Sequence, residues 1–179
     1  MKTVLLLLAS AAAGAVGALG FAPFGVWPFT ILSAAALSVV LWFANRLRNA
    51  AGFGYAYGLA FMGVGVNWMS AIFTDAMFAL VAVTSLYFIL LAILIKLAQK
   101  APFWPLLAAG AWTACELGLN YFPFGGFGWM RLGYAMVDSP LAGAYPLVGV
   151  GIVGFFAALA GQLIGWFLLK VSVGRGVWT

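Results

Sequence analysis

Six apolar segments separated by short breaks constrain this chain more than any other feature. They cover residues 3–20, 27–44, 50–70, 76–95, 103–119 and 147–169. Each is close to the roughly 20 residues that a helix, rising about 1.5 Å per residue, needs to cross a hydrocarbon layer of about 30 Å. The sequence therefore predicts an all-α polytopic membrane protein. Its residues 1–179 are expected to form one domain, a six-helix transmembrane bundle.

The scarcity of charge supports this prediction. Charged residues make up 6% of the chain and hydrophobic residues 66%, whereas a soluble domain carries about 25% charged residues. Such a chain has too little charge to cover a surface that faces water. The opening "MKTVLLLLASAAAGA" resembles a cleaved signal peptide, but the apolar run continues to Gly20, so we expect a retained helix.

The basic residues orient the predicted bundle. All three acidic residues and Arg131 fall on one side of the six segments. Because basic loops stay in the cytoplasm, we expect both termini to be cytoplasmic. The remaining basic residues lie on the side of the termini: Lys2, Arg46, Arg48, Lys96, Lys100, Lys170 and Arg175.

Several kinds of chemistry are excluded. The sequence has no histidine and one cysteine, Cys115, so an internal disulfide, a zinc site of the His/Cys type and a Ser-His or Cys-His nucleophile pair are ruled out within these residues. We expect no metal and no cofactor. Cys115 is expected to be a small buried hydrophobic residue. The basic residues are scattered among helix ends, which indicates topology rather than binding of nucleic acid.

Small residues four apart indicate where helices meet. Gly54 and Gly58 ("GYAYG") and Gly161 and Gly165 ("GQLIG") follow the spacing that lets two backbones approach closely in lipid. We interpret both pairs as packing sites only.

Three aromatic, glycine-rich segments are predicted to meet on the outer face. They are "GFAPFGVWP" (residues 20–28), "GVGVNWMSAIFTD" (63–75) and "ELGLNYFPFGGFGWMRLGYAMVDSP" (116–140). Rings at headgroup depth are ordinary anchors in membrane proteins. However, irregular backbone survives at membrane depth only when it is buried in protein or lines a cavity. We therefore favour an outer cavity for lipid or substrate, with Asn67, Trp68, Trp129 and the neighbouring Phe124 among its residues.

Glu116 and Arg131 carry the charge of this outer region. Glu116 lies about one turn from the end of its segment, where an unpaired charge costs on the order of 2–3 kcal/mol. Arg131 is the only basic residue on that side, so we expect the two to pair. Either the pair is a structural salt bridge that holds the loop to the helix, or Arg131 faces a lipid phosphate.

The same segments resemble a known family. "LGFAPFGVWP", "GLAFMGVGVNWM" and "AWTACE…PFGGFGWMRLGYAMVDSPLAG" are similar, in this order, to the membrane region of bacterial apolipoprotein N-acyltransferases, with "PFGGFGW" most like the actinobacterial members. The resemblance implies a multi-pass protein of the bacterial plasma (inner) membrane. It also implies transfer of an acyl chain from a phospholipid to the lipidated N-terminal cysteine of an apolipoprotein, without a cofactor.

The resemblance further implies a catalytic part that we expect downstream of Thr179. Family members carry a nitrilase-like domain whose Glu-Lys-Cys triad forms a thioester. That domain is absent from residues 1–179, so this segment alone is expected to be inactive. Its expected role is the outer-leaflet vestibule for lipid and substrate, formed by Asn67, Trp68, Glu116, Trp129 and Arg131. Family members also commonly have an arginine where this chain has Leu119.

Two other functions compete with this interpretation. Some actinobacterial members are fused to, or partner, a polyprenol-phosphate mannose synthase, so the chain is alternatively a non-catalytic scaffold for such an enzyme. A small transporter is less favoured, because the deep positions offer only hydroxyls and amides, namely Ser33, Ser38, Thr84 and Gln162.

Overall fold

The computed structural model describes residues 1–123 and 125–173, and these ranges contain helices and turns but no strand. Phe124 and Arg175, both named above, lie outside the described residues. Three 3₁₀-helices accompany the α-helices: η1 (Asn67–Ala71), η2 (Leu132–Met136) and η3 (Pro140–Ala144). The described α-helices are α1 (Lys2–Ala18), α2 (Trp27–Trp42), α3 (Leu47–Gly65), α4 (Thr74–Ala98), α5 (Trp104–Leu119) and α6 (Tyr145–Val173).

Proline and glycine account for several helix ends. Pro28 and Pro105 occupy the second positions of α2 and α5, where a missing N–H costs nothing because the first turn has no acceptor for it. α3 stops at Gly65, and the chain continues after Val66 as η1. These ends fall within a few residues of the six apolar segments.

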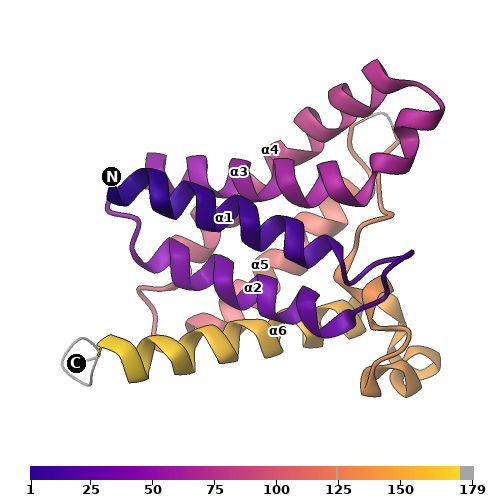
Figure 1. Cartoon of the computed structure of the whole chain (residues 1–179). Coiled ribbons are helices and arrows are strands. Elements are labelled where there is room, and N and C mark those ends of the chain that lie inside the picture. The colour runs from indigo at the N-terminus through magenta and orange to yellow at the C-terminus, as the bar shows by residue number, and fades with distance from the viewer. Residues whose placement is uncertain (124, 174–179) are drawn as a thin grey trace.

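The six described α-helices form a closed ring. Around the ring the order is α1, α3, α4, α5, α6 and α2, and α2 contacts α1 again. Figure 1 shows the N-terminus and the C-terminal end of α6 at the same end of the bundle. We call this the basic end, because Lys2, Arg46, Arg48, Lys96, Lys100 and Lys170 lie there. The other end holds Asp75, Glu116, Arg131 and Asp138 and is called the acidic end.

Glycines bring the helix backbones into direct contact, as the sequence predicted. A Cβ added at Gly54 of α3 would lie 2.2 Å from the Phe88 carbonyl oxygen of α4. One added at Gly161 of α6 would lie 2.7 Å from the Ile31 carbonyl oxygen of α2. Gly58 and Gly165 lie against the same two neighbouring helices. Each pair is therefore a packing site, at which a larger side chain has no room.

Tyr57 lies at the centre of the ring. Its side chain is fully buried and contacts the rings of Phe61, Phe88 and Trp112, with ring centroids 5.4–6.2 Å apart. Its hydroxyl is 2.7 Å from the Ser33 hydroxyl, which donates to the Ala13 carbonyl. The hydroxyls of Tyr57 and Ser33 are thus both satisfied, which is the condition for burying them.

Two side chains of α4 bind the end of α2. Lys96 donates to the Trp42 carbonyl at 2.8 Å, and Gln99 donates to the Ser38 carbonyl at 2.8 Å. The Ser38 hydroxyl in turn donates to Gln162 of α6. The Lys96 bond caps the end of α2, where the last carbonyls look outside the helix for donors, and the three bonds together join α2, α4 and α6.

Two stretches are long and apolar enough to cross a membrane by themselves. They are Thr74–Ala98, with a mean hydropathy of 2.7, and Pro140–Ser172, with a mean hydropathy of 2.2. α1 and α2 are apolar but shorter, with 17 and 16 residues. The helical architecture is confirmed, whereas the six-span topology and the cytoplasmic termini stay predictions.

The contact at Gly54 makes a first prediction. Gly54→Ala forces the Phe88 carbonyl and Ala92 away, and overpacking of this kind costs about 1–3 kcal/mol, so the unfolding temperature in detergent should fall. Gly52→Ala is the matched control, since a Cβ there meets nothing within 4 Å and alanine favours the helix. Equal unfolding temperatures for the two variants would contradict the close contact of α3 with α4.

Candidate functional site

The chain after α5 folds back onto the end of that helix. The Phe127 N–H donates to the Leu119 carbonyl at 2.7 Å, which satisfies one of the free carbonyls of α5. Gly125 and Gly126 have φ angles of 87° and 93°, a region that favours glycine. A Cβ at Gly126 would also lie 2.1 Å from the Asn120 carbonyl oxygen. This local sequence therefore places residues 127–132 beside the last turn of α5.

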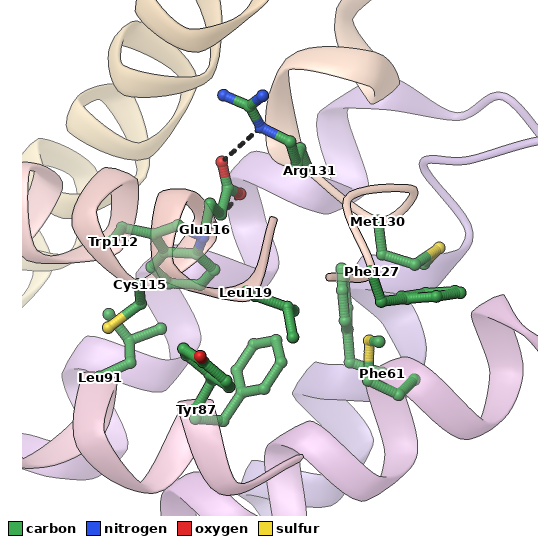
Figure 2. Close-up of a pocket in the computed structure, with 12 residues that line it drawn as sticks. Phe61, Tyr87, Leu91, Trp112, Cys115, Glu116, Leu119, Phe127, Met130 and Arg131 are labelled. Carbon is green, nitrogen blue, oxygen red and sulfur yellow. Dashed lines mark hydrogen bonds and ion pairs between the residues drawn. The ribbon is translucent and has the colours of Figure 1, made fainter. Parts of the chain in front are cut away.

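Glu116 holds the returning chain in place. One carboxylate oxygen accepts the Leu132 N–H at 2.8 Å and the Trp112 indole N–H at 3.2 Å. The other oxygen is 3.9 Å from Arg131 Nε, and both side chains are only 11% exposed. Figure 2 shows the two side chains side by side at the edge of a small pocket. The expected pair is present, but the shortest contact of Glu116 is to the main chain of Leu132.

α6 leaves room for this pair. Its backbone is kinked at Gly149, which has a φ of 72°. Two residues further, a Cβ at Gly151 would lie 3.2 Å from a terminal nitrogen of Arg131, and one at Gly154 would lie 3.5 Å from Glu116 Oε2. Two glycines on one face of α6 therefore form a notch over the charged pair.

Arg131 is only partly engaged by Glu116. At 3.9 Å the contact is an ion pair and not a hydrogen bond. Among the described residues, Arg131 Nε is buried without a hydrogen-bond partner. The guanidinium thus keeps donors that an anion with two oxygens would satisfy.

A stack of aromatic rings covers the loop. Trp68 of η1 lies parallel to Trp129, with centroids 5.3 Å apart and an angle of 10° between the planes. Trp129 stacks in turn on Phe127 at 5.7 Å. Met130 packs on Gly65 at the end of α3. The stack joins the break after α3 to the loop after α5.

A large apolar cavity lies beneath this stack. Its volume is about 520 Å³, which is within the usual range for ligand sites. It exists because α4 continues beyond the end of α5: Gly118, near that end, faces Tyr87, so on this side residues 74–86 of α4 face η1 and the loop after α5 instead of α5 itself. The lining residues are Trp68, Met69, Ala76, Ala79, Leu80, Val83, Thr84, Pro123, Gly126, Phe127 and Trp129.

Comparison with known proteins shows to which family this chain belongs. The family model described as the apolipoprotein N-acyltransferase N-terminal domain matches residues 13–163. The chain belongs to this family. It is 36% identical to an apolipoprotein N-acyltransferase of Ralstonia nicotianae over 84% of its own length, and 34% identical to one of Coxiella burnetii over 96%. It covers 32% and 37% of those relatives, so it spans about a third of their length.

Four of the five site residues predicted for this member of the N-acyltransferase family fall into two groups. Glu116 and Arg131 lie together in the small pocket. Trp68 and Trp129 lie together at the large cavity. Phe127 borders both spaces and so separates the charged pair from the cavity. Asn67 lies in neither, and with Trp68 it lines another cavity of about 420 Å³ beside residues 22–24.

Some site residues were not predicted from the sequence. Ala76, Ala79, Leu80 and Val83 form one face of α4, and their spacing of three and four residues was a signal that could have found them. Trp112 precedes Glu116 by four residues, the spacing at which helical side chains meet. The Leu132 N–H carries no sequence signal, because every residue except proline has one.

Cys115 has the predicted character. Its thiol is free and the residue is 7% exposed. It borders the same small pocket as Glu116. Within the described ranges, no three His, Cys, Asp or Glu residues gather in a way that would hold a metal ion.

The geometry at Glu116 makes a second prediction. Glu116→Leu leaves the Leu132 and Trp112 N–H groups without an acceptor, which costs about 1–3 kcal/mol. Glu116→Gln keeps an oxygen for both. In thermal unfolding, Glu116→Leu should therefore be less stable than Glu116→Gln.

Arg131 provides the control for this comparison. Arg131→Leu strands the Glu116 charge, and combining it with Glu116→Gln should recover stability, whereas combining it with Glu116→Leu should not. If both double mutants recover equally, the bond to the main chain is unimportant and the ion pair alone holds the loop.

Proposed function

We propose that this chain is the membrane region of an apolipoprotein N-acyltransferase, and that its acidic end forms the vestibule through which lipid and lipoprotein reach the catalytic chemistry. The acyl donor is a phospholipid, and the acceptor is the lipidated N-terminal cysteine of an apolipoprotein. The observation that carries the proposal is the apolar cavity of about 520 Å³ next to a partly engaged arginine, in a chain of this family.

The cavity is suited to an acyl chain. Its walls are aliphatic and aromatic, and its one hydroxyl, Thr84, already donates to the Leu80 carbonyl at 2.7 Å. An acyl chain lying there therefore leaves this hydroxyl with its partner. Because the cavity wall across from the first turns of α4 is formed by η1 and the loop after α5, and not by an α-helix, lipid enters sideways from the bilayer.

The charged pair is suited to the headgroup. Phe127 is shared by the small pocket and the cavity, so a phospholipid with its acyl chain against Phe127 brings its phosphate toward Arg131. The guanidinium then binds phosphate oxygens with the donors that Glu116 leaves free. Glu116 holds Leu132, and through it the backbone next to Arg131.

We propose that residues 1–179 supply access rather than the covalent step. The sole cysteine is buried, and the sequence contains no histidine to activate it. A transport function is disfavoured by the deep polar residues. Ser33 and Ser38 are bonded to Ala13, Tyr57 and Gln162 instead of facing a path through the bundle.

The proposal includes six membrane spans with both termini in the cytoplasm. Reporter fusions at Asn49 and Ala101 should therefore read as cytoplasmic, and a fusion at Asp75 should read as exported. A cytoplasmic result at Asp75 would place the acidic end on the wrong side of the membrane for this function.

The function itself is tested on the lipoproteins of the cell. Removing the gene that encodes this chain should leave lipoprotein N-terminal peptides lighter by one acyl group in mass spectrometry. Ala79→Trp, which fills the cavity, should restore the missing acyl group poorly when expressed in that strain.

Ala114→Trp is the control, because Ala114 is exposed on α5 and borders none of the cavities described here. It should restore acylation as well as the unaltered chain does. Unchanged peptides after gene removal would refute the function, whereas full activity of Ala79→Trp would refute only the vestibule.

A further inference from the structure

The basic end carries a groove that the proposed function does not use. It lies between the start of α5 and the second half of α6 and has a volume of about 320 Å³. Its lining is almost wholly apolar. The residues are Pro102, Phe103, Pro105, Leu106, Leu159, Leu163 and Trp166.

A fixed cation stands at this groove. Lys170 Nζ lies 3.9 Å from the centroid of the Trp166 ring, and Trp166 lines the groove. A lysine held over an indole in this way still has N–H groups that point away from the ring and are available to a second partner. Lys100 precedes the lining residue Pro102 by two positions. The groove is therefore apolar along its length and positive at one end.

The start of α5 adds to the positive electrostatic potential at this end of the groove. Its first N–H groups already donate, Trp104 to the Ala101 carbonyl and Leu106 to the Phe103 carbonyl, and Pro105 has none, so this helix end contributes a weak positive potential rather than hydrogen-bond donors. The three acidic residues of the sequence, Asp75, Glu116 and Asp138, all lie at the opposite end of the bundle. Within the part of the chain that the structure describes, no carboxylate competes for these positive groups.

From this combination we infer that the groove binds one anionic phospholipid from the leaflet at the basic end. An acyl chain lies along Leu159, Leu163 and Trp166, and the phosphate lies between Lys170 and the start of α5. Basic pockets between membrane helices recognise anionic headgroups in this way, with about 1 kcal/mol for each lysine or arginine near the surface. The site is distinct from the vestibule and depends only on the chain being embedded in a membrane.

Native mass spectrometry of the full chain tests the inference. The chain is released from neutral detergent in the presence of either phosphatidylglycerol or phosphatidylcholine with the same acyl chains, and the dissociation constant of the first bound lipid is measured. Phosphatidylglycerol should bind more tightly. Lys170→Gln should weaken that binding roughly fivefold, the change that one lost cation produces.

Lys2→Gln is the matched control. Lys2 is also exposed, at the same end, and over an aromatic ring, Phe43, at 5.6 Å, but Phe43 does not line the groove, whereas the Trp166 ring under Lys170 does. It should leave phosphatidylglycerol binding unchanged. Leu163→Trp, a change at a half-exposed position on the groove wall, should weaken binding by blocking the acyl chain while the unfolding temperature stays the same.

Three results would overturn the inference. They are equal binding of the two lipids, equal effects of Lys170→Gln and Lys2→Gln, and unaltered binding by Leu163→Trp. Ala79→Trp should not change phosphatidylglycerol affinity at this groove, so failure of the vestibule and failure of this site remain distinguishable.

Discussion

The backbone of α3 lies directly against the backbone of α4, and the rest of the bundle depends on contacts of this kind. Helices in lipid gain little by burying apolar side chains against each other, because the acyl chains are just as apolar. Close approach at Gly54 and Gly161 increases the number of dispersion contacts instead. Hydrogen bonds between helices, such as those of Ser33 and Gln99, add directional contacts at fixed positions. Together they determine which helices are neighbours in the ring.

The Glu116–Arg131 pair lies against this packed core and connects it to the loop at the acidic end. Tyr57 contacts Trp112 in the core, Trp112 donates to Glu116, and Glu116 accepts the N–H of Leu132. A continuous path of contacts therefore runs from the centre of the ring to the loop. Arg131 is held in place mainly by the hydrogen bond from the backbone of its neighbour Leu132 to Glu116, and less by its own ion pair with that carboxylate. That arrangement leaves a guanidinium in a defined position with donors free for a ligand, which is the condition for a preorganised binding group.

Much of this fold could be predicted from the residues, but the site only in part. Long apolar runs and the glycine pairs Gly54/Gly58 and Gly161/Gly165 depend on local spacing, and the helices and their contacts followed from them. The Glu116–Arg131 contact was predictable because the outer side offered no other basic partner. The cavity was not, since it depends on how far α4 extends past α5. The stacking of Trp68 on Trp129 could not be predicted either, because it joins two irregular segments whose relative placement follows from no periodic pattern in the sequence.

The unequal lengths of α4 and α5 have a mechanical consequence in the proposed topology. α4 has 25 residues and α5 has 16, so at about 1.5 Å per residue the two helices differ in length by roughly 14 Å. A bilayer adapts to such hydrophobic mismatch by local thinning or by tilt of the longer helix. A thicker membrane surrounds more of the first turns of α4, and a thinner one leaves them among the headgroups. The width of the cavity entrance is therefore coupled to acyl-chain length in the surrounding lipid, which makes membrane composition itself a variable that acts on this protein.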